Sequence, residues 1–368
     1  MTVSERQNLI GMTRIEMQSF FVSLGVREFH ARQVLQWIYQ RGITDFSQMT
    51  DLSKALRDQL QQLAQITVPE TVTVQQSSDS TRKWLLRFED GNCIETVFIP
   101  EQDRGTLCVS VQVGCSLNCT FCATAKQGFS RNLTTAEIIG QLLTVKTDLQ
   151  ALGYGDRPIT NVVLMGMGEP LLNYDAVVAA LHLMLDDLSF GMSRRRVTLS
   201  TAGIVPAMER LALDCPVSLA VSLHATNNDL RDELVPLNRK YPIEQLLQAC
   251  HQYVAGENKR HITFEYVMLK GINDSKGEAQ ILARLLSGLP AKINLIPFNP
   301  FPNSDYLCSS AETISRFKDV LHKAGIVTTI RKTRGEDIDA ACGQLVGKVK
   351  DKSRRHLKLQ KMGISNAI

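Results

Sequence analysis

The sequence predicts an α/β fold, a partial (β/α)6 TIM-like barrel preceded by a small helical domain. Two observations predict it. Apolar, β-rich runs follow one another after residue 107, separated by segments with helical periodicity, and this alternation is typical of βα units that build a parallel sheet. Several of these runs also end in Gly, Ser, His or Asn, and barrel enzymes collect their reactive groups at such strand ends.

The chain divides into four segments. In residues 1–66 apolar residues recur at helical spacing, which predicts a helical accessory domain. Residues 67–104 alternate like strands around Asp90-Gly91, so we expect a β-ribbon linker with a hairpin turn. Residues 105–345 form the barrel core, and residues 346–368 are a basic C-terminal tail. The expected barrel runs are CVSVQVG, NVVLMGMG, RVTLSTAG, VSLAVSLH, HITFEYVML, KINLIPFNP and IVTTIRKTRG.

Composition narrows the class of protein. The apolar share of 44% and the charged share of 21% are ordinary for a globular chain. No apolar run approaches the roughly 18 residues that cross a bilayer, and the N-terminus lacks a signal-peptide pattern, so we expect a cytoplasmic protein with no membrane contact. Nine cysteines in such a chain favour ligands, nucleophiles or buried thiols over a disulfide framework. The net charge of +4 is compatible with a nucleic-acid partner but does not establish one.

Three cysteines stand close together after the first barrel run. Cys115, Cys119 and Cys122 have CxxxCxxC spacing, and three thiolates leave one iron of a four-iron cluster open. An open iron can bind S-adenosylmethionine, and electron transfer then yields a 5′-deoxyadenosyl radical. This spacing resembles the radical S-adenosylmethionine superfamily. The alternative is a zinc site, although zinc usually takes four protein ligands and no fourth Cys or His lies nearby.

The strand ends indicate where a cofactor would bind. Gly168 and Glu169 close the second barrel run; glycines let a backbone approach a ligand closely, and a carboxylate suits the cofactor's amino group. Other strand-end residues carry groups for ribose or adenine, and each is equally compatible with a satisfied barrel-end residue. These further candidates are Ser200, Ser222, Leu223, His224 and Asn299.

Several separated motifs narrow the family. The stretches IETVFIP, GCSLNCTFCATAKQGFSRNL, MGMGEPLLN, STAGIVP, SLHA, IPFNP and RGEDIDAACGQL closely resemble the RlmN-type RNA adenine methyltransferases over nearly the whole chain. The resemblance implies methylation of adenine carbon 2 in 23S rRNA near the peptidyl-transferase centre and in tRNA beside the anticodon. It also implies a [4Fe-4S] cluster, two S-adenosylmethionine molecules per turnover, an electron donor such as flavodoxin or ferredoxin, and a monomer. The Cfr family shares these cysteines but methylates carbon 8, and this alternative stays open.

The resemblance also implies three catalytic residues. Carbon 2 of adenine lies between two ring nitrogens and is electron-poor, so it does not attack a methyl sulfonium. In the family, the residue matching Cys342 takes a methyl group and links it to the ring as a thioether, and the residue matching Cys108 releases the RNA by forming a disulfide with it. Glu95 matches the family's proton acceptor. An extended strand would hold Cys108 roughly 23 Å from Cys115 unless the segment bends, so a buried structural thiol remains an alternative for Cys108.

Basic residues suggest RNA contacts. The runs Arg194-Arg195-Arg196 and Arg331-Lys332-Thr333-Arg334 are expected near barrel ends, and the tail is basic. The helical domain at 1–66 also carries cations, so we expect it to bind RNA phosphates. Each charge run is equally compatible with a solvated surface.

Overall fold

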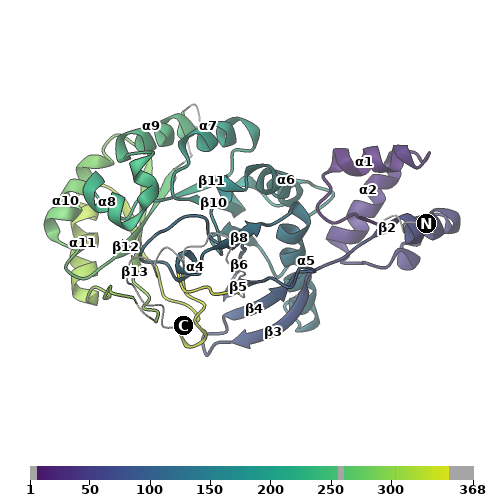
Figure 1. Cartoon of the computed structure of the whole chain (residues 1–368), viewed down its shortest axis with the longest axis horizontal. Coiled ribbons are helices and arrows are strands. Elements are labelled where there is room, and N and C mark those ends of the chain that lie inside the picture. Colours follow the sequence, from purple (N-terminus) through teal and green to yellow (C-terminus); the bar gives the residue numbers. More distant parts are fainter. Residues whose placement is uncertain (1–5, 256–260, 303, 348–368) are drawn as a thin grey trace, which may run out of the picture.

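The computed structural model describes residues 6–255, 261–302 and 304–347. A helical module lies at one end of the molecule and a barrel forms the rest (Figure 1). Its helices are α1 (Arg14–Ser23), α2 (Phe29–Leu35), the π-helical turn Gln36–Gln40, the 3-10 turn Phe46–Gln48 and α3 (Lys54–Leu63). Thr13 and Glu16 form a capping box that begins α1, and such a box satisfies backbone N–H groups left free at a helix start.

The first and last segments of the helical module pair with each other. Strand β1 (Gln7–Asn8) pairs in parallel with β2 (Ala64–Gln65), so the first and last residues of the module meet. Buried apolar side chains such as Met17, Phe21 and Leu60 fill its interior.

The barrel is one ten-stranded sheet in the order β14-β13-β12-β11-β10-β9-β6-β5-β4-β3. The strands from β6 to β14 in this order run parallel, and helical crossovers link them in sequence, which confirms the predicted partial barrel. Its strands are β3 (Glu70–Gln76), β4 (Arg82–Arg87), β5 (Cys93–Glu101), β6 (Arg104–Cys108), β9 (Asn161–Leu164), β10 (Val197–Thr201), β11 (Ser218–Ser222), β12 (Ile262–Met268), β13 (Ala291–Pro297) and β14 (Val327–Ile330). The covering helices are α5 (Thr135–Ala151), α6 (Tyr174–Leu185), α7 (Val205–Asp214), α8 (Asn228–Leu234), α9 (Ile243–Val254), α10 (Lys276–Leu285) and α11 (Ala311–Lys323).

The segment expected as a ribbon linker belongs to this sheet. The turn at Asp90-Gly91 joins β4 to β5, and Gly91 has φ +79°, a left-handed conformation that suits glycine. β5 pairs antiparallel with β6. Residues 70–101 therefore extend the barrel wall instead of forming a separate connector.

The first barrel run is not one strand, and this corrects the sequence expectation. β6 ends at Cys108, and a short strand, β7 (Gln112–Gly114), pairs with β8 (Phe129–Asn132) in a separate sheet. Between them the Gln141 side-chain amide accepts from Ser110 N at 2.9 Å and donates to Ser110 O at 2.8 Å. Gln141 thus occupies both backbone groups that Ser110 would use in a sheet, so the chain turns there.

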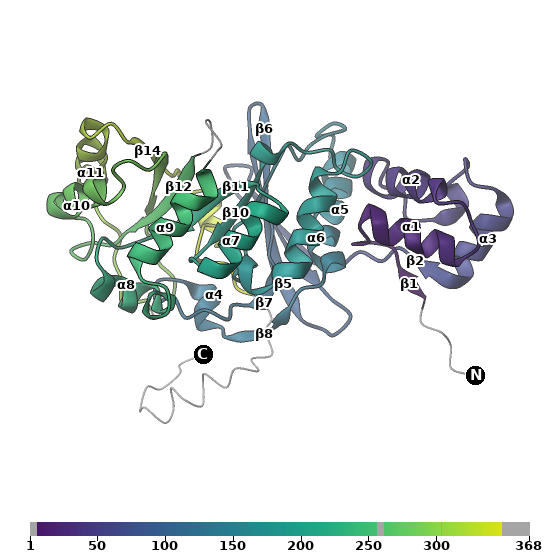
Figure 2. The same cartoon turned by 90° about the horizontal axis from the view of Figure 1, so that it is seen from above.

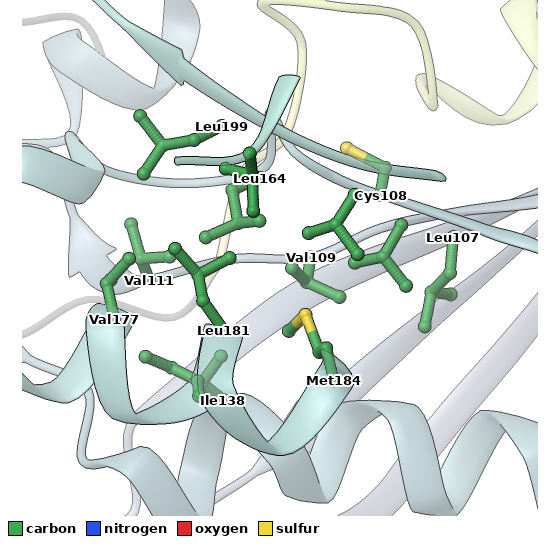
Figure 3. Packing of buried hydrophobic residues seen from close by; sticks show 14 of the residues in the cluster. Leu107, Cys108, Val109, Val111, Ile138, Leu164, Val177, Leu181, Met184 and Leu199 are labelled. Atoms are coloured by element: carbon green, nitrogen blue, oxygen red, sulfur yellow. The ribbon is translucent and has the colours of Figure 1, made fainter. Parts of the chain in front are cut away.

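The two sides of β6 face different surroundings. Figure 3 shows Leu107 and Val109 on the side of the helices, near Met184, whereas the sulfur of Cys108 points away from them. Alternate residues of a strand face opposite sides of a sheet. Cys108 therefore faces the barrel interior, although its side chain is buried.

The module is fixed against the barrel by polar contacts. Lys146 on α5 donates to the carbonyls of Tyr39 and Gln40, both at 2.8 Å, and Arg14 pairs with Asp186 at 2.6 Å. The module lies beyond α5 and α6, away from the barrel centre (Figure 2). Among the described residues, no helix combines the length and the apolar character that crossing a bilayer requires.

Candidate active site

A cavity opens among the carboxyl ends of the barrel strands and brings together most of the residues expected at the site. The cysteine loop forms one side and the polar strand ends form another. Residues near the C-terminus close it, although they are distant in sequence. The expected residues that line it are Cys115, Cys119, Cys122, Gly168, Glu169, Ser200, Ser222, His224, Asn299 and Cys342.

The cysteine loop is held by backbone contacts at several points. Cys115 follows β7 and its N–H donates to Gly128 O at 2.8 Å, while Thr120 N donates to Leu234 O at the end of α8 at 3.1 Å. Cys122 precedes the short helix α4 (Ala123–Lys126). Burial, followed by the charges of the two neighbouring thiols, raises the pKa of Cys119. The loop therefore holds three thiols at one cavity wall, and binding to a metal would release their protons.

This donor set fits an iron–sulfur cluster. Within the described ranges, no three His, Cys, Asp or Glu side chains are grouped closely enough to hold a single metal ion, as a zinc centre requires. A four-iron cluster places each thiolate on a different iron, so its ligands stand further apart.

Glu169 is a buried carboxylate at the cavity wall. Its oxygens accept from Leu171 N at 3.1 Å and from Ala202 N at 2.8 Å. Burial raises its pKa to about 6 because removal from water disfavours the charged form. The carboxylate can still bind a cationic amino group at neutral pH.

The structure gives another reason for the glycine at 168. Gly168 has φ +101°, and a Cβ there would lie 2.5 Å from the Cβ of Gln112. Glycine is therefore required by the close packing of the 109–112 segment, and not only by the approach of a ligand.

The remaining strand-end residues differ in their exposure to the cavity. His224 has φ +62° and is buried; its Nδ1 accepts from Val267 N at 3.1 Å, which leaves Nε2 as the donor. Burial and nearby Arg231 lower the pKa of His224 to about 3, so the ring is neutral. Ser200 and Ser222 line the cavity, whereas Leu223 is fully buried, donates its N–H to Glu265 O and does not line the cavity.

Cys342 reaches the cavity on a segment that returns from β14. Asn299 at the end of β13 donates its amide to Cys342 O at 3.2 Å, and Ala123 at the start of α4 donates its N–H to Gly343 O at 2.7 Å. Gln344 donates to Pro300 O at 2.9 Å. The segment therefore lies between the barrel and the cysteine loop, with Cys342 in contact with the cavity.

Cys108, the last residue of β6, lies near Cys342. Both residues line a second, smaller cavity that adjoins the first. Burial and the charge of Cys342 raise the pKa of Cys108 to about 12. The long distance expected between Cys108 and Cys115 is therefore no obstacle to the proposed role of Cys108, because its partner is Cys342 and not Cys115.

Glu95 lies beside this second cavity without lining it. Its carboxylate pairs with Lys83 at 2.9 Å and accepts from Val346 N at 2.8 Å. Burial raises its pKa. Val97, two residues along β5 on the same face, pairs with Cys108 and lines the cavity. Glu95 is therefore two residues along the strand from the residue that neighbours Cys108.

Two charged residues that were not predicted from the sequence as part of the site line the cavity. Glu265 on β12 lines the main cavity, and its carboxylate accepts from Asn294 at 2.9 Å. Arg331, expected as an RNA contact, instead lines both cavities, where its charge interacts with Cys342. In a basic stretch of sequence, no local pattern separates an arginine that points into a cavity from one that points to solvent.

The run at 194–196 lies at a barrel end, as expected, but at the end away from the cavity. It forms a 3-10 turn directly before β10, so it lies at the amino end of the strand, opposite the catalytic cavity. Arg196 instead lines a cavity with Tyr39 and Gln40, where the module meets the barrel. The basic tail from residue 348 lies outside the described residues.

The chain matches known proteins in both sequence and structure. Residues 7–66 match the Ribosomal RNA large subunit methyltransferase N-terminal domain, and residues 109–280 match the Radical SAM superfamily. The chain is 57% identical to the Dual-specificity RNA methyltransferase RlmN of Marinobacter nauticus, covering 96% of each chain. It is 56% identical to the protein of the same name from Pseudomonas fluorescens, covering 96% of this chain and 93% of that one. A crystal structure of a radical SAM methyltransferase from Sphaerobacter thermophilus superposes with a TM-score of 0.86 at 44% identity, over 92% of this chain and 99% of that one.

Proposed function

Because the chain belongs to the RlmN family of dual-specificity RNA methyltransferases within the radical SAM superfamily, we propose that it methylates carbon 2 of adenine in 23S rRNA and in tRNA beside the anticodon. The observation that carries this proposal is the position of Cys342 between the cysteine loop and Cys108. One sulfur can there meet both the cofactor site and a second thiol.

The enzyme uses a [4Fe-4S] cluster and S-adenosylmethionine, which together supply the methyl group and the one-electron chemistry. Cys115, Cys119 and Cys122 would hold the cluster, and Glu169 would bind the cofactor's amino group, with Gly168 beside it. Ser200, Ser222, Leu223, His224 and Asn299 would border the rest of the cofactor; this is supported by the cavity that most of them share. Leu223, which lies outside the cavity wall, would act through its backbone.

The cysteine pair would act in sequence. Cys342 accepts a methyl group on its sulfur, carries it to the ring and becomes joined to the RNA as a thioether. Cys108 then attacks the Cys342 sulfur, so the bond between that sulfur and the transferred carbon breaks as the disulfide forms, and the carbon left on the ring takes a proton to become the methyl group. Glu95 would accept the ring proton; its raised pKa suits a base, and reaching the ring requires the contact with Val346 to open.

RNA would also contact the helical domain at residues 1–66. Arg27, Arg32 and Arg41 are exposed on it, and exposed cations bind phosphates without reading sequence. Residues 105–345 would carry the cofactor site and the cysteine pair, the 67–104 segment would complete their wall and supply Glu95, and the tail at 346–368 would add charge.

The product is tested directly by mass spectrometry of RNA digested after reaction, with 2-methyladenosine and 8-methyladenosine as standards. We expect the carbon-2 product from both rRNA and tRNA. An 8-methyladenosine product would place the enzyme with Cfr-like activity and contradict the proposal. The variant Cys342→Ala should give no methylated RNA.

The cluster ligands are tested by a matched pair of variants. Cys119→Ala should lose bound iron and sulfide together with reductive cleavage of S-adenosylmethionine. Cys308→Ala removes a partly buried thiol outside the cysteine loop and should keep a full cluster. Retention of four irons in Cys119→Ala would overturn the assignment.

Two further features of the proposal concern partners. A small one-electron protein such as flavodoxin or ferredoxin would reduce the cluster, and the enzyme would act as a monomer. Cofactor cleavage driven by each reduced donor, and light scattering that gives the mass of one chain, are the measurements that check them.

A further inference from the structure

Arg331 occupies a position that the reaction above leaves without a role. Its backbone N–H donates to Leu295 O at 2.8 Å, which fixes the residue against β13. Its guanidinium lies in the wall shared by the two cavities and faces three sulfurs. It hydrogen-bonds to the Met165 sulfur at 3.8 Å and is close enough to Cys342 and Cys108 for their charges to interact.

The guanidinium has few other partners for its charge. No carboxylate among the described residues forms an ion pair with it, and Glu265, whose charge acts on it, is hydrogen-bonded to Asn294. Burial raises the pKa of Glu265, which weakens it as a counter-charge. A guanidinium withdrawn from water needs acceptors, and the cysteine sulfurs are the acceptors within reach.

We infer that Arg331 is a positioning residue for the sulfur pair, whose guanidinium stabilises reduced Cys342 and Cys108 and keeps the disulfide between them easy to reduce. This rests on the proposed function, since the disulfide belongs to that reaction. The cationic guanidinium can donate a charge-assisted hydrogen bond to a thiol sulfur and can stabilise a thiolate as it forms, whereas a disulfide sulfur has no proton to lose and is a poor acceptor. Oxidation therefore deprives Arg331 of its partners, and stabilisation of the reduced form makes a disulfide more oxidising.

The benefit lies in the reset of the enzyme. After the RNA leaves, Cys342 cannot take another methyl group until the disulfide has been reduced. That step needs a thiol reductant, which gives two electrons and two protons to the two sulfurs and is itself oxidised to a disulfide. A cation beside the pair shifts this equilibrium toward the thiols.

The test is a redox equilibrium on full-length, cluster-loaded protein without RNA. Anaerobic mixtures of reduced and oxidised glutathione set the potential: one oxidised glutathione takes two electrons and two protons from the cysteines and becomes two thiols. After acid quenching and alkylation, mass spectrometry measures the fraction of protein with the Cys108–Cys342 disulfide. The variants are Arg331→Met, which removes the charge at similar length, and Arg331→Lys, which keeps it. The control is Arg316→Gln, since Arg316 is an exposed cation on α11.

We expect the equilibrium constant for disulfide formation to be about tenfold higher in Arg331→Met than in the wild type, a potential about 30 mV more negative. Arg331→Lys should fall between them, and Arg316→Gln should match the wild type. Equal constants in Arg331→Met and the wild type overturn the inference alone. If the wild type forms no such disulfide at any glutathione ratio, the two-cysteine reaction falls with it. If Arg331→Met loses its cluster, the same measurement is made on Arg331→Lys, which keeps the charge, and on Arg331→Gln, which removes it.

Discussion

Replacing Cys108 by Ala separates a catalytic thiol from a structural one. The backbone of Cys108 pairs with Val97 and Val163 on its two sides, and its carbonyl accepts from Thr96 Oγ1 at 2.7 Å. Alanine keeps all of these contacts. Only the sulfur is lost, and it already borders a cavity, so the free energy of unfolding should fall by about 1 kcal/mol or less. The variant should therefore fold and bind its cluster.

Its reaction should nevertheless stop at the protein–RNA thioether. Cys342 can still take up a methyl group and join the ring, but no thiol remains to displace the RNA. Denaturing electrophoresis with labelled RNA should show a slowly migrating adduct in Cys108→Ala and none in Cys342→Ala. Cys215→Ala is the matched control, because it empties a similarly buried position in the core and should turn over without an adduct. Normal turnover by Cys108→Ala would refute the reasoning.

Three further outcomes are expected. The affinity for S-adenosylmethionine, measured by calorimetry on cluster-loaded protein, should fall as the pH drops through about 6, the pKa of Glu169, because protonation removes the charge that attracts the amino group. An unchanged affinity at pH 5 would contradict that role. Gln141→Leu leaves the N–H and C=O of Ser110 unpaired and should cost about 2–6 kcal/mol in denaturant unfolding, whereas Gln150→Leu, which loses an exposed bond on the same helix, should cost little. Reversing Arg27 and Arg32 to Glu should weaken RNA binding in filter assays and leave cofactor cleavage without RNA unchanged; equal affinity would exclude the module from the RNA contact.

The parts of the site that follow from local sequence were predictable. The spacing of Cys115, Cys119 and Cys122 needs only one loop to bring the thiols together, and glutamate and serine at strand ends meet at one edge of a parallel sheet. The position of the 194–196 run at the amino end of the barrel could also have been predicted from the sequence, because these arginines precede their strand. Parallel strands share a direction, so a residue before one cannot lie with residues that follow the others.

The parts that depend on distant contacts were not predictable. The bend after Cys108 arises because Gln141, 31 residues from Ser110, takes both of its backbone groups, and no pattern within the run CVSVQVG signals a break. Arg331 in RKTR has the local appearance of a surface cation. Only the approach of the 342–347 segment, which encloses the end of β14, turns its environment into a cavity wall.

The route of that segment explains how one sulfur can serve two steps. Asn299 holds the carbonyl of Cys342 and the start of α4 holds that of Gly343, so the backbone on both sides of the sulfur is tied to fixed elements. The cysteine loop lines the first cavity and Cys108 lines the second, and Cys342 borders both. Rotation about the Cα–Cβ bond of Cys342 changes which cavity its sulfur enters, and exchange between staggered side-chain positions is fast compared with backbone rearrangement. In the proposed reaction, we therefore expect the transfer from cofactor to ring and then to Cys108 to need only rotation of the Cys342 side chain, while the backbone of its segment stays in place.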